Sequence, residues 1–368
     1  METLFPDYKR CGINVSSSIM QYFRVQPAHD TLQPLDEILS KKKYRNIVLM
    51  LFDGMGIDAL KNHLPSDSFL RTHVQETLSA VFPSTTTAAI PSIECAAPPY
   101  EHGWMGWTVY FEDIDKSVNV FTNQEQMSKN QAADYHVGSK FLPLDSVFDK
   151  INRQSTAKAT CVSCHKIPSC KTLLDIRTHA MNLLNEEGEH YVYTYWGDPD
   201  HTMHKNGVKD ASITQILKEI DRYVEDFAMN MPKDTLLLVT ADHGLIDSEN
   251  IFLSDYPDLV HMLLRPPTVE PRATAFHVKP EYKDVFLPTL KDALGDKFLY
   301  MTGEEFINSG LIGSGKKNHK LPSIVGDFVA IAVTPACILY SHDSFILKGV
   351  HAGLTKAEMQ VPLIVFSR

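Results

Sequence analysis

The chain has 368 residues, of which 43% are hydrophobic and 22% are charged, and its formal net charge is −10. This length suits one large domain or a core with a smaller insertion, and the ordinary composition excludes a disordered or fibrous protein. The negative charge argues against binding to nucleic acid or to an anionic membrane, since both need a positive field. A phosphate substrate stays open, because bound divalent cations can reverse the local charge.

The sequence also favours a particular compartment. It contains no apolar run of the length that crosses a membrane, and its amino-terminal segment lacks the basic and apolar regions of a secretion signal. Six cysteines at uneven spacing favour reduced thiols over a disulfide framework. We therefore expect a cytoplasmic protein that binds neither membranes nor nucleic acid polymers, and the sequence leaves its oligomeric state open.

Short, continuously apolar runs alternate along the chain with segments of helical periodicity. Four such runs, typical of strands buried on both faces, lie at residues 46–52, 190–196, 235–241 and 361–366. Three segments with apolar residues at helical spacing lie at residues 144–153, 170–188 and 213–227. This alternation predicts an α/β fold in which helices cover both faces of a mostly parallel sheet.

Residues 249–335 follow a different pattern, with Pro266-Pro267 and a β-α-β-α-β order of shorter elements. A segment of this size can form a small α+β cap inserted between elements of the main domain. We therefore predict a core formed by residues 1–248 and 336–368, with residues 249–335 as the inserted cap subdomain.

Three cysteines lie close together in the sequence, at Cys161, Cys164 and Cys170. Cys161-x-x-Cys164-His165 has the spacing of covalent haem attachment, and the three thiols could also form a zinc knuckle. Because the segment continues a β-rich run and no export is indicated, we favour a plain strand followed by a loop.

Two of the predicted strands end in residues that can bind metal ions. Asp53 follows the run at 46–52, and Asp242 and His243 follow the run at 235–241. A single aspartate after a strand is usually a turn residue. Open parallel sheets, however, bind ligands at the carboxyl ends of their strands, and two such ends with an adjacent histidine favour a binding site.

A second candidate ligand pair follows the strand predicted at 190–196. Asp200 and His204 lie four residues apart, so on a helix their side chains would share one face and could bind one ion. Asp198 and His201 form a competing pair three residues apart, which spacing alone does not exclude.

His351 is a further candidate ligand. Thr355-x-x-Glu358 has the pattern of a capping box, so a helix is expected to begin just beyond His351 and to leave this residue on a loop. A single histidine is more often structural than a ligand, and the local sequence leaves both roles open.

The segment FPSTTTAAI at residues 82–90 has the features of a helix N-terminus. Backbone N–H groups and the positive end of the helix dipole favour an anion at such a position. A hydroxyl there, beside a metal ion, could act as a nucleophile, because the metal lowers its pKa. Simple capping by Ser84, Thr85, Thr86 or Thr87 is the alternative, and the local sequence does not decide between them.

Five segments together resemble the alkaline phosphatase superfamily, in its branch of type I phosphodiesterase/nucleotide pyrophosphatase-like proteins. In chain order they are LFDGMG at 51–56, FPSTTTAA at 82–89, PDHTMH at 199–204, TADHG at 240–244 and VHAGLT at 350–355. Each motif is weak alone, but five in the family's order, spread over nearly the whole chain, are specific.

The resemblance implies an alkaline phosphatase-like fold with a site for two zinc ions. The implied ligands are carboxylates, imidazoles and one hydroxyl: Asp53, Asp242, His243 and Thr86 for one ion, and Asp200, His204 and His351 for the other. The family's nucleophile lies three residues after the proline of its motif, which is Thr86 in this sequence. Oxygen and imidazole ligands suit zinc, and Mn²⁺ or Mg²⁺ could occupy one oxygen-rich subsite.

The activity that the resemblance implies is hydrolysis of a small-molecule phosphate ester through a phospho-threonine at Thr86, with diesters modestly preferred to monoesters. Two alternatives of the same fold, a phosphonate C–P hydrolase and a phosphomutase, would use the same metal site. A binding protein without catalysis is a third, and the intact set of ligands and hydroxyl argues against it.

The sequence departs from the family at the expected substrate contacts. Nucleotide pyrophosphatases of this branch usually carry an asparagine beyond the nucleophile that donates to a phosphoryl oxygen, and here Trp107 takes that place. Its indole could donate one hydrogen bond, although Trp104 and Trp107 could equally be wall or core aromatics. Three further candidate anion contacts lie in the predicted cap: Arg272, His277 and His319.

Overall fold

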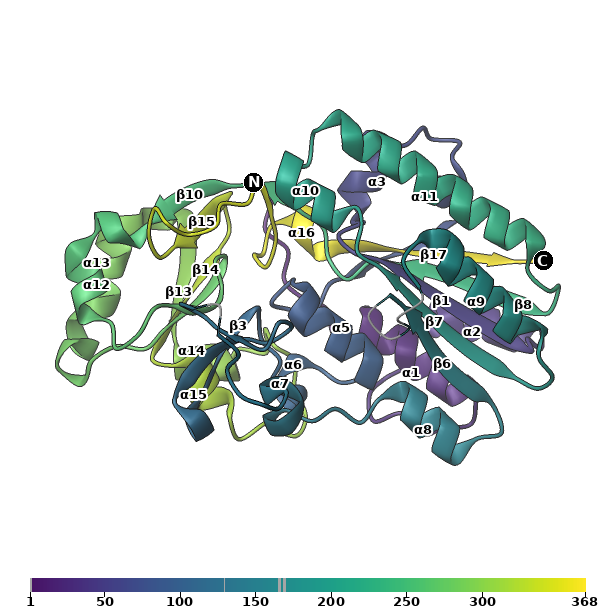
Figure 1. Cartoon of the computed structure of the whole chain (residues 1–368), viewed down its shortest axis with the longest axis horizontal. Helices are drawn as coiled ribbons and strands as arrows, with labels where there is room; N and C mark the ends of the chain where they lie inside the picture. Colours follow the sequence, from purple (N-terminus) through teal and green to yellow (C-terminus); the bar gives the residue numbers. More distant parts are fainter. Residues whose placement is uncertain (1, 129, 165–166, 168–169) are drawn as a thin grey trace.

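The computed structural model describes residues 2–128, 130–164, 167 and 170–368, and it contains two main sheets, each with its own helices (Figure 1). Cys161 lies in a strand that ends at Ser163, as expected for that segment. The haem-type spacing includes His165, which lies outside the described residues. No helix in the described part of the chain is long and apolar enough to cross a membrane.

The six-stranded sheet is built mainly from the continuously apolar runs. Its strands, in spatial order, are β2 (Val74–Ser79), β17 (Gln360–Ser367), β8 (Thr235–Thr240), β1 (Asn46–Phe52), β7 (His190–Trp196) and β6 (Lys158–Ser163). β8, β1, β7 and β6 run parallel, and all seven residues of β1 are buried, as expected for a central strand covered on both faces. β17 runs antiparallel to β8 and β2. The sequence did not indicate this direction, because an apolar run predicts a buried strand but not which way the strand runs.

Helices cover both faces of this sheet, as predicted (Figure 1). Four helices pack together in one group: α1 (Gly12–Tyr22), α2 (Gln33–Lys41), α5 (Thr86–Cys95) and α8 (Val147–Gln154). A second group consists of α3 (Ile57–His63), α4 (Phe69–Thr72), α10 (Asp200–Asn206) and α11 (Ala211–Asn230). α9 (Leu173–Asn185) packs against β6 and β7. The predicted α/β class is therefore confirmed.

The seven-stranded sheet is antiparallel. Its strands, in spatial order, are β13 (Phe298–Thr302), β14 (Phe328–Ala332), β12 (Ala273–Phe276), β11 (Thr268–Glu270), β3 (Thr108–Phe111), β4 (Lys116–Asn119) and β5 (Gln124–Glu125). The helices of this part are α6 (Pro99–His102), α7 (Val137–Phe141), α12 (Pro257–Met262), α13 (Lys283–Leu294), α14 (Gly303–Asn308) and α15 (Leu321–Val325). Short 3-10 helices lie at Glu112–Ile114, Leu253–Asp255, Pro280–Tyr282 and Gly295–Lys297.

Two short strand pairs lie where the chain passes between the sheets. β10 (Glu249–Phe252) pairs with β15 (Ala336–Leu339), and β9 (Ile246–Asp247) pairs with β16 (Gly349–Val350), shortly before α16 (Lys356–Met359). Because Glu249 lies opposite Ala336, the two ends of segment 249–335 are close together, as an insertion requires.

The second sheet nevertheless takes strands from both sides of the predicted boundary at residue 248. β3, β4 and β5 come from residues 108–125, and β3 joins β11 through the pairing of Thr108 with Val269. A pairing between segments so far apart in the chain leaves no local sequence signal. The division into core and cap therefore stays a prediction. The second sheet includes strands from outside the segment 249–335.

Candidate metal centre and nucleophile

The carboxyl ends of β1, β7 and β8 bring three aspartates together at one edge of the six-stranded sheet. These strands are parallel neighbours, and each aspartate follows one of them. The Asp53 N–H donates to the Trp196 carbonyl at 2.9 Å, and the Gly54 N–H donates to Asp242 Oδ1 at 3.1 Å. The Asp200 N–H donates to the Asp53 carbonyl at 3.0 Å. Backbone hydrogen bonds thus hold the three strand ends together.

Asp53, Asp242 and His243 form a first, buried group whose ligand atoms all lie within 4.8 Å of one another. His243 Nε2 is 3.5 Å from Asp53 Oδ1 and 3.4 Å from Asp242 Oδ2. His243 Nδ1 lies 3.1 Å from the Gly244 carbonyl, and donation to it leaves the Nε2 lone pair facing the carboxylates. This group has the geometry of a cation site.

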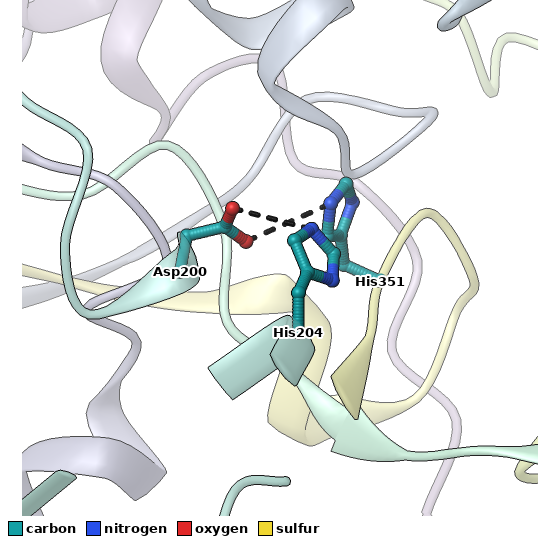
Figure 2. A group of neighbouring side chains, drawn as sticks. All are labelled: Asp200, His204 and His351. Carbon is teal, nitrogen blue, oxygen red and sulfur yellow. Dashed lines mark ion pairs between the residues drawn. The ribbon is translucent and has the colours of Figure 1, made fainter. Parts of the chain in front are cut away.

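Asp200, His204 and His351 form a second group, also within 4.8 Å (Figure 2). Asp200 faces both rings, with Oδ2 at 3.2 Å from His204 Nε2 and Oδ1 at 3.7 Å from His351 Nε2. His204 Nδ1 is 2.8 Å from the Gly349 carbonyl, and His351 Nδ1 is 3.1 Å from the Ser84 carbonyl. Those carbonyls accept the Nδ1 protons and direct both Nε2 atoms into the site.

The two groups adjoin, and Thr86 lies beside the first of them. The rings of His243 and His351 are stacked with centroids 3.9 Å apart. Thr86 Oγ1 is 3.1 Å from His243 Nε2 and 3.3 Å from each oxygen of Asp53. Thr86 is also the first residue of α5, with Thr85 at the N-cap position, so its hydroxyl lies at a helix end that favours anions.

The charges of this cluster fit divalent cations. Burial, followed by the nearby charges of Asp242 and Asp200, holds the pKa of Asp53 well above its ordinary range. Burial, followed by the two neighbouring imidazoles, holds the pKa of His351 well below its ordinary value. Asp200 Oδ1 and Asp242 Oδ2 are buried and have no hydrogen-bond partner among the described residues. Buried carboxylate oxygens without hydrogen-bond partners are costly, and cations bound here would satisfy these two oxygens.

The structure also resolves the alternative that the sequence left open around α10. Asp198 Oδ1 accepts hydrogen bonds from the Thr202 N–H at 3.3 Å and the Thr202 hydroxyl at 2.8 Å, so it caps the start of the helix. His201 is exposed. Within the described residues the two candidate metal groups contain neither of these residues and no cysteine, and Asp200 and His204 are the pair that faces the other ligands.

Two residues contact this site without having been predicted. The Tyr195 hydroxyl donates to Asp53 Oδ2. Glu270 Oε1 accepts from the Thr85 hydroxyl at 2.8 Å and from the Thr87 hydroxyl at 3.4 Å. The position of Tyr195 near the carboxyl end of a predicted strand could have indicated it. Glu270 reaches the site from the other sheet, and no local pattern indicates such a contact.

The two tryptophans have different surroundings. Trp107 is 44% exposed, its ring packs edge-on against Phe121, and its backbone N–H donates to Glu270 Oε1 at 2.7 Å. Its role as a substrate contact stays a prediction. Trp104 is buried and its indole N–H donates to the Leu142 carbonyl, which makes it a core aromatic.

Two of the three anion contacts predicted in the cap are wrong. The Arg272 guanidinium is fully buried and donates to both carboxylate oxygens of Glu358, each at 2.7 Å, and to two backbone carbonyls. His277 Nε2 lies 2.8 Å from the Ser323 carbonyl, and burial lowers the pKa of this ring, which keeps it neutral. Both side chains are engaged inside the protein. His319 is exposed, and its role stays a prediction.

Carboxylates, imidazoles and a hydroxyl thus meet at one edge of a mixed sheet, where they form a candidate metal centre beside a candidate nucleophile. The sequence model of the type I phosphodiesterase/nucleotide pyrophosphatase family matches residues 47–341, which is most of the chain. The chain therefore belongs to this family, and it is a hydrolase. No curated protein sequence matches it.

Solved structures share the fold. Murine ectonucleotide pyrophosphatase/phosphodiesterase 5 is 17% identical, with a TM-score of 0.67 over 89% of this chain and 88% of that one. An inactive threonine-to-alanine variant of that protein, in complex with AMP, has a TM-score of 0.68 at the same identity and coverage. Phosphonoacetate hydrolase from Sinorhizobium meliloti 1021, in complex with phosphonoformate, is 15% identical, with a TM-score of 0.62 over 88% and 90%.

Proposed function

We propose that this protein is a two-zinc hydrolase of phosphoric esters that acts through a covalent intermediate on Thr86. The observation that carries the proposal is the position of Thr86 Oγ1, 3.1 Å from His243 Nε2 and 3.3 Å from both Asp53 oxygens, at the start of α5. A hydroxyl held there can meet an anionic group and lose its proton.

The two ligand groups would each hold one zinc ion. Asp53, Asp242, His243 and Thr86 would bind one, and Asp200, His204 and His351 the other. When bound, zinc would lower the pKa of the Thr86 hydroxyl and offset negative charge on the phosphoryl oxygens. Ligands without thiolate suit zinc, with Mn²⁺ or Mg²⁺ as alternatives at one subsite. Elemental analysis of the purified protein tests the identity of the metal.

Thr86 Oγ1 would attack phosphorus in line with the ester oxygen that leaves. As the bond from Oγ1 to phosphorus forms, the bond from phosphorus to the leaving oxygen breaks, and that oxygen takes up a proton from solvent. The Thr86 proton passes to solvent. Water then attacks phosphorus in the phospho-threonine, which releases the phosphate product and restores the hydroxyl.

Small phosphodiesters would be the preferred substrates. The structural relative solved with AMP supports a small phosphate ester as the ligand class. The test is hydrolysis of bis-p-nitrophenyl phosphate and of p-nitrophenyl phosphate by zinc-loaded protein, with and without a chelator. We expect chelator-sensitive activity that is higher on the diester. A higher activity on the monoester would contradict the preference.

Phosphonate hydrolysis is the second candidate, supported by the shared fold of phosphonoacetate hydrolase. Release of phosphate and acetate from phosphonoacetate, without release of nitrophenol from the diester, would favour it. A phosphomutase would move a phosphoryl group within a sugar phosphate and would release neither phosphate from a panel of metabolites nor nitrophenol from the diester. The phosphate and nitrophenol assays together therefore separate all three activities.

A further inference from the structure

We propose that Glu270 determines specificity at this site by disfavouring phosphate monoester dianions relative to phosphodiester monoanions. The inference rests on the proposed function and concerns a residue outside both metal-ligand groups. Glu270 is the last residue of β11, so the second sheet supplies it to a site otherwise built on the first sheet.

Glu270 contacts the residues at the start of α5. Its Oε1 accepts hydrogen bonds from Thr85 Oγ1 at 2.8 Å, from Thr87 Oγ1 at 3.4 Å and from the Trp107 N–H at 2.7 Å. Thr85 and Thr87 are the two neighbours of Thr86 in the chain. The carboxylate is therefore held next to the nucleophile and next to the helix end that would receive the phosphoryl group.

The backbone next to Glu270 is closely packed and has an uncommon conformation. Val269 has φ of 71°, a conformation that β-branched residues rarely adopt. A side chain at Gly106 would place its Cβ 2.5 Å from the Val269 carbonyl oxygen, so these two segments pack with no spare room. Uncommon backbone conformations persist only where the surrounding structure fixes them. The position of the carboxylate is thus set by the fold.

The Glu270 carboxylate places a negative charge near the candidate metal groups, and His204 is a titratable side chain that acts on it electrostatically. Glu270 is 8% exposed and forms no ion pair with any Lys, Arg or His of the described residues, and its Oε2 has no hydrogen-bond partner among them. Burial raises the pKa of the Glu270 carboxyl, and the three hydrogen bonds donated to Oε1 oppose this shift by stabilising the ionised form.

The Glu270 charge distinguishes substrates by the charge that the substrates themselves carry. A phosphate monoester carries about 1.5 to 2 negative charges near pH 7, whereas a diester carries one. The additional charge of the monoester is repelled by Glu270 in a partly buried environment, where one pair of like charges corresponds to a roughly tenfold to hundredfold loss in binding. Glu270 therefore supplies selectivity for diesters that the metal ligands alone do not provide.

The test replaces Glu270 by glutamine, which keeps an oxygen for the three donors and removes the charge. We expect Glu270→Gln to raise kcat/KM for p-nitrophenyl phosphate at least tenfold relative to that for bis-p-nitrophenyl phosphate, at pH 8. In a Thr86→Ala background, which prevents turnover, calorimetry should show tighter binding of phenyl phosphate to zinc-loaded Glu270→Gln by a similar factor. Glu219→Gln removes an exposed carboxylate on α11 and should change neither value.

The outcomes separate this inference from the proposed function. An active enzyme whose monoester-to-diester ratio and phenyl phosphate affinity are unchanged in Glu270→Gln overturns the role of Glu270 alone. An equal loss of activity on both esters also overturns it, because that result assigns Glu270 to positioning α5. If zinc-loaded wild-type protein hydrolyses neither ester but binds phenyl phosphate, the proposed function fails, and the binding comparison still tests Glu270.

Discussion

The role of Thr86 as a nucleophile can be tested separately from metal binding by the neighbouring residues. Its hydroxyl contacts Asp53 and His243, but those side chains, with Asp242, still form a complete ligand group without it. We expect Thr86→Ala to lower kcat by at least about a thousandfold, as loss of a nucleophile does, and to retain zinc. Steady-state kinetics and metal analysis of the same preparation check this. Full activity in Thr86→Ala would contradict the covalent mechanism.

Tyr195 acts on the site through Asp53. Its hydroxyl donates to Asp53 Oδ2, so it orients a ligand that zinc would share with Thr86. We expect Tyr195→Phe to weaken zinc binding roughly tenfold to hundredfold, because residues that orient ligands have effects of that size. Competition with a zinc chelator measures the affinity. Tyr135→Phe, which changes a tyrosine packed on Phe141 away from the site, should leave the affinity unchanged.

At the scale of elements, the buried pair of Arg272 and Glu358 joins the β11–β12 hairpin to the loop that carries His351. Glu358 also accepts hydrogen bonds from the Gly353 N–H at 2.8 Å and from the Thr355 hydroxyl at 2.5 Å. One carboxylate thus completes the predicted capping box and binds the guanidinium of the other sheet. This pair joins the loop of the candidate ligand His351 to the sheet that carries Glu270, together with the hydrogen bond from the Leu354 N–H to the Ala332 carbonyl at 2.9 Å.

We expect Glu358→Gln to lower the free energy of unfolding by about 3–5 kcal/mol, because it leaves a buried guanidinium without its counter-charge. Urea denaturation of the metal-free protein measures this. Asp145→Asn, which breaks the exposed pair with Arg153, is the matched control and should have a much smaller effect. Equal effects of the two substitutions would show that the buried pair contributes little.

Sequence patterns predicted the features that depend on local sequence better than those that depend on contacts between distant segments. The apolar run before Asp53 and the four-residue spacing of Asp200 and His204 are local patterns, so the strand and the helix could be predicted from them, whereas the choice between the pairs Asp200/His204 and Asp198/His201 could not. Contacts across the two sheets are not local, and Glu270 and the burial of Arg272 depend on them. Its charge made Arg272 a candidate anion contact, but the carboxylate that it binds, Glu358, lies 86 residues away in the sequence.

At the scale of the whole molecule, metal binding and pH are linked. The raised pKa of Asp53 favours the folded metal-free protein at low pH, and this contribution is lost as pH rises through the folded value. The lowered pKa of His351 acts in the opposite direction, since its contribution is present above the unfolded value of about 6.5 and is lost as pH falls. Zinc needs both groups deprotonated.

We therefore expect zinc binding to release protons and zinc to raise Tm more at pH 8 than at pH 5.5. Thermal denaturation of metal-free and zinc-loaded protein at both values, with calorimetry in buffers of different ionisation enthalpy, measures the two effects. A zinc-induced Tm shift that does not change with pH would contradict the role of Asp53 as a ligand.

The ligands of the two groups lie far apart in the sequence, from Asp53 to His351, and each arrives on a different strand end, helix or loop. No fragment that lacks either end of this span can assemble both groups. A bound ion would therefore act as a crosslink that only the complete native chain can form, and it would stabilise that state by mass action. Zinc affinity then becomes a measure of conformational integrity: damage anywhere in either sheet would lower the apparent affinity, even with every ligand intact.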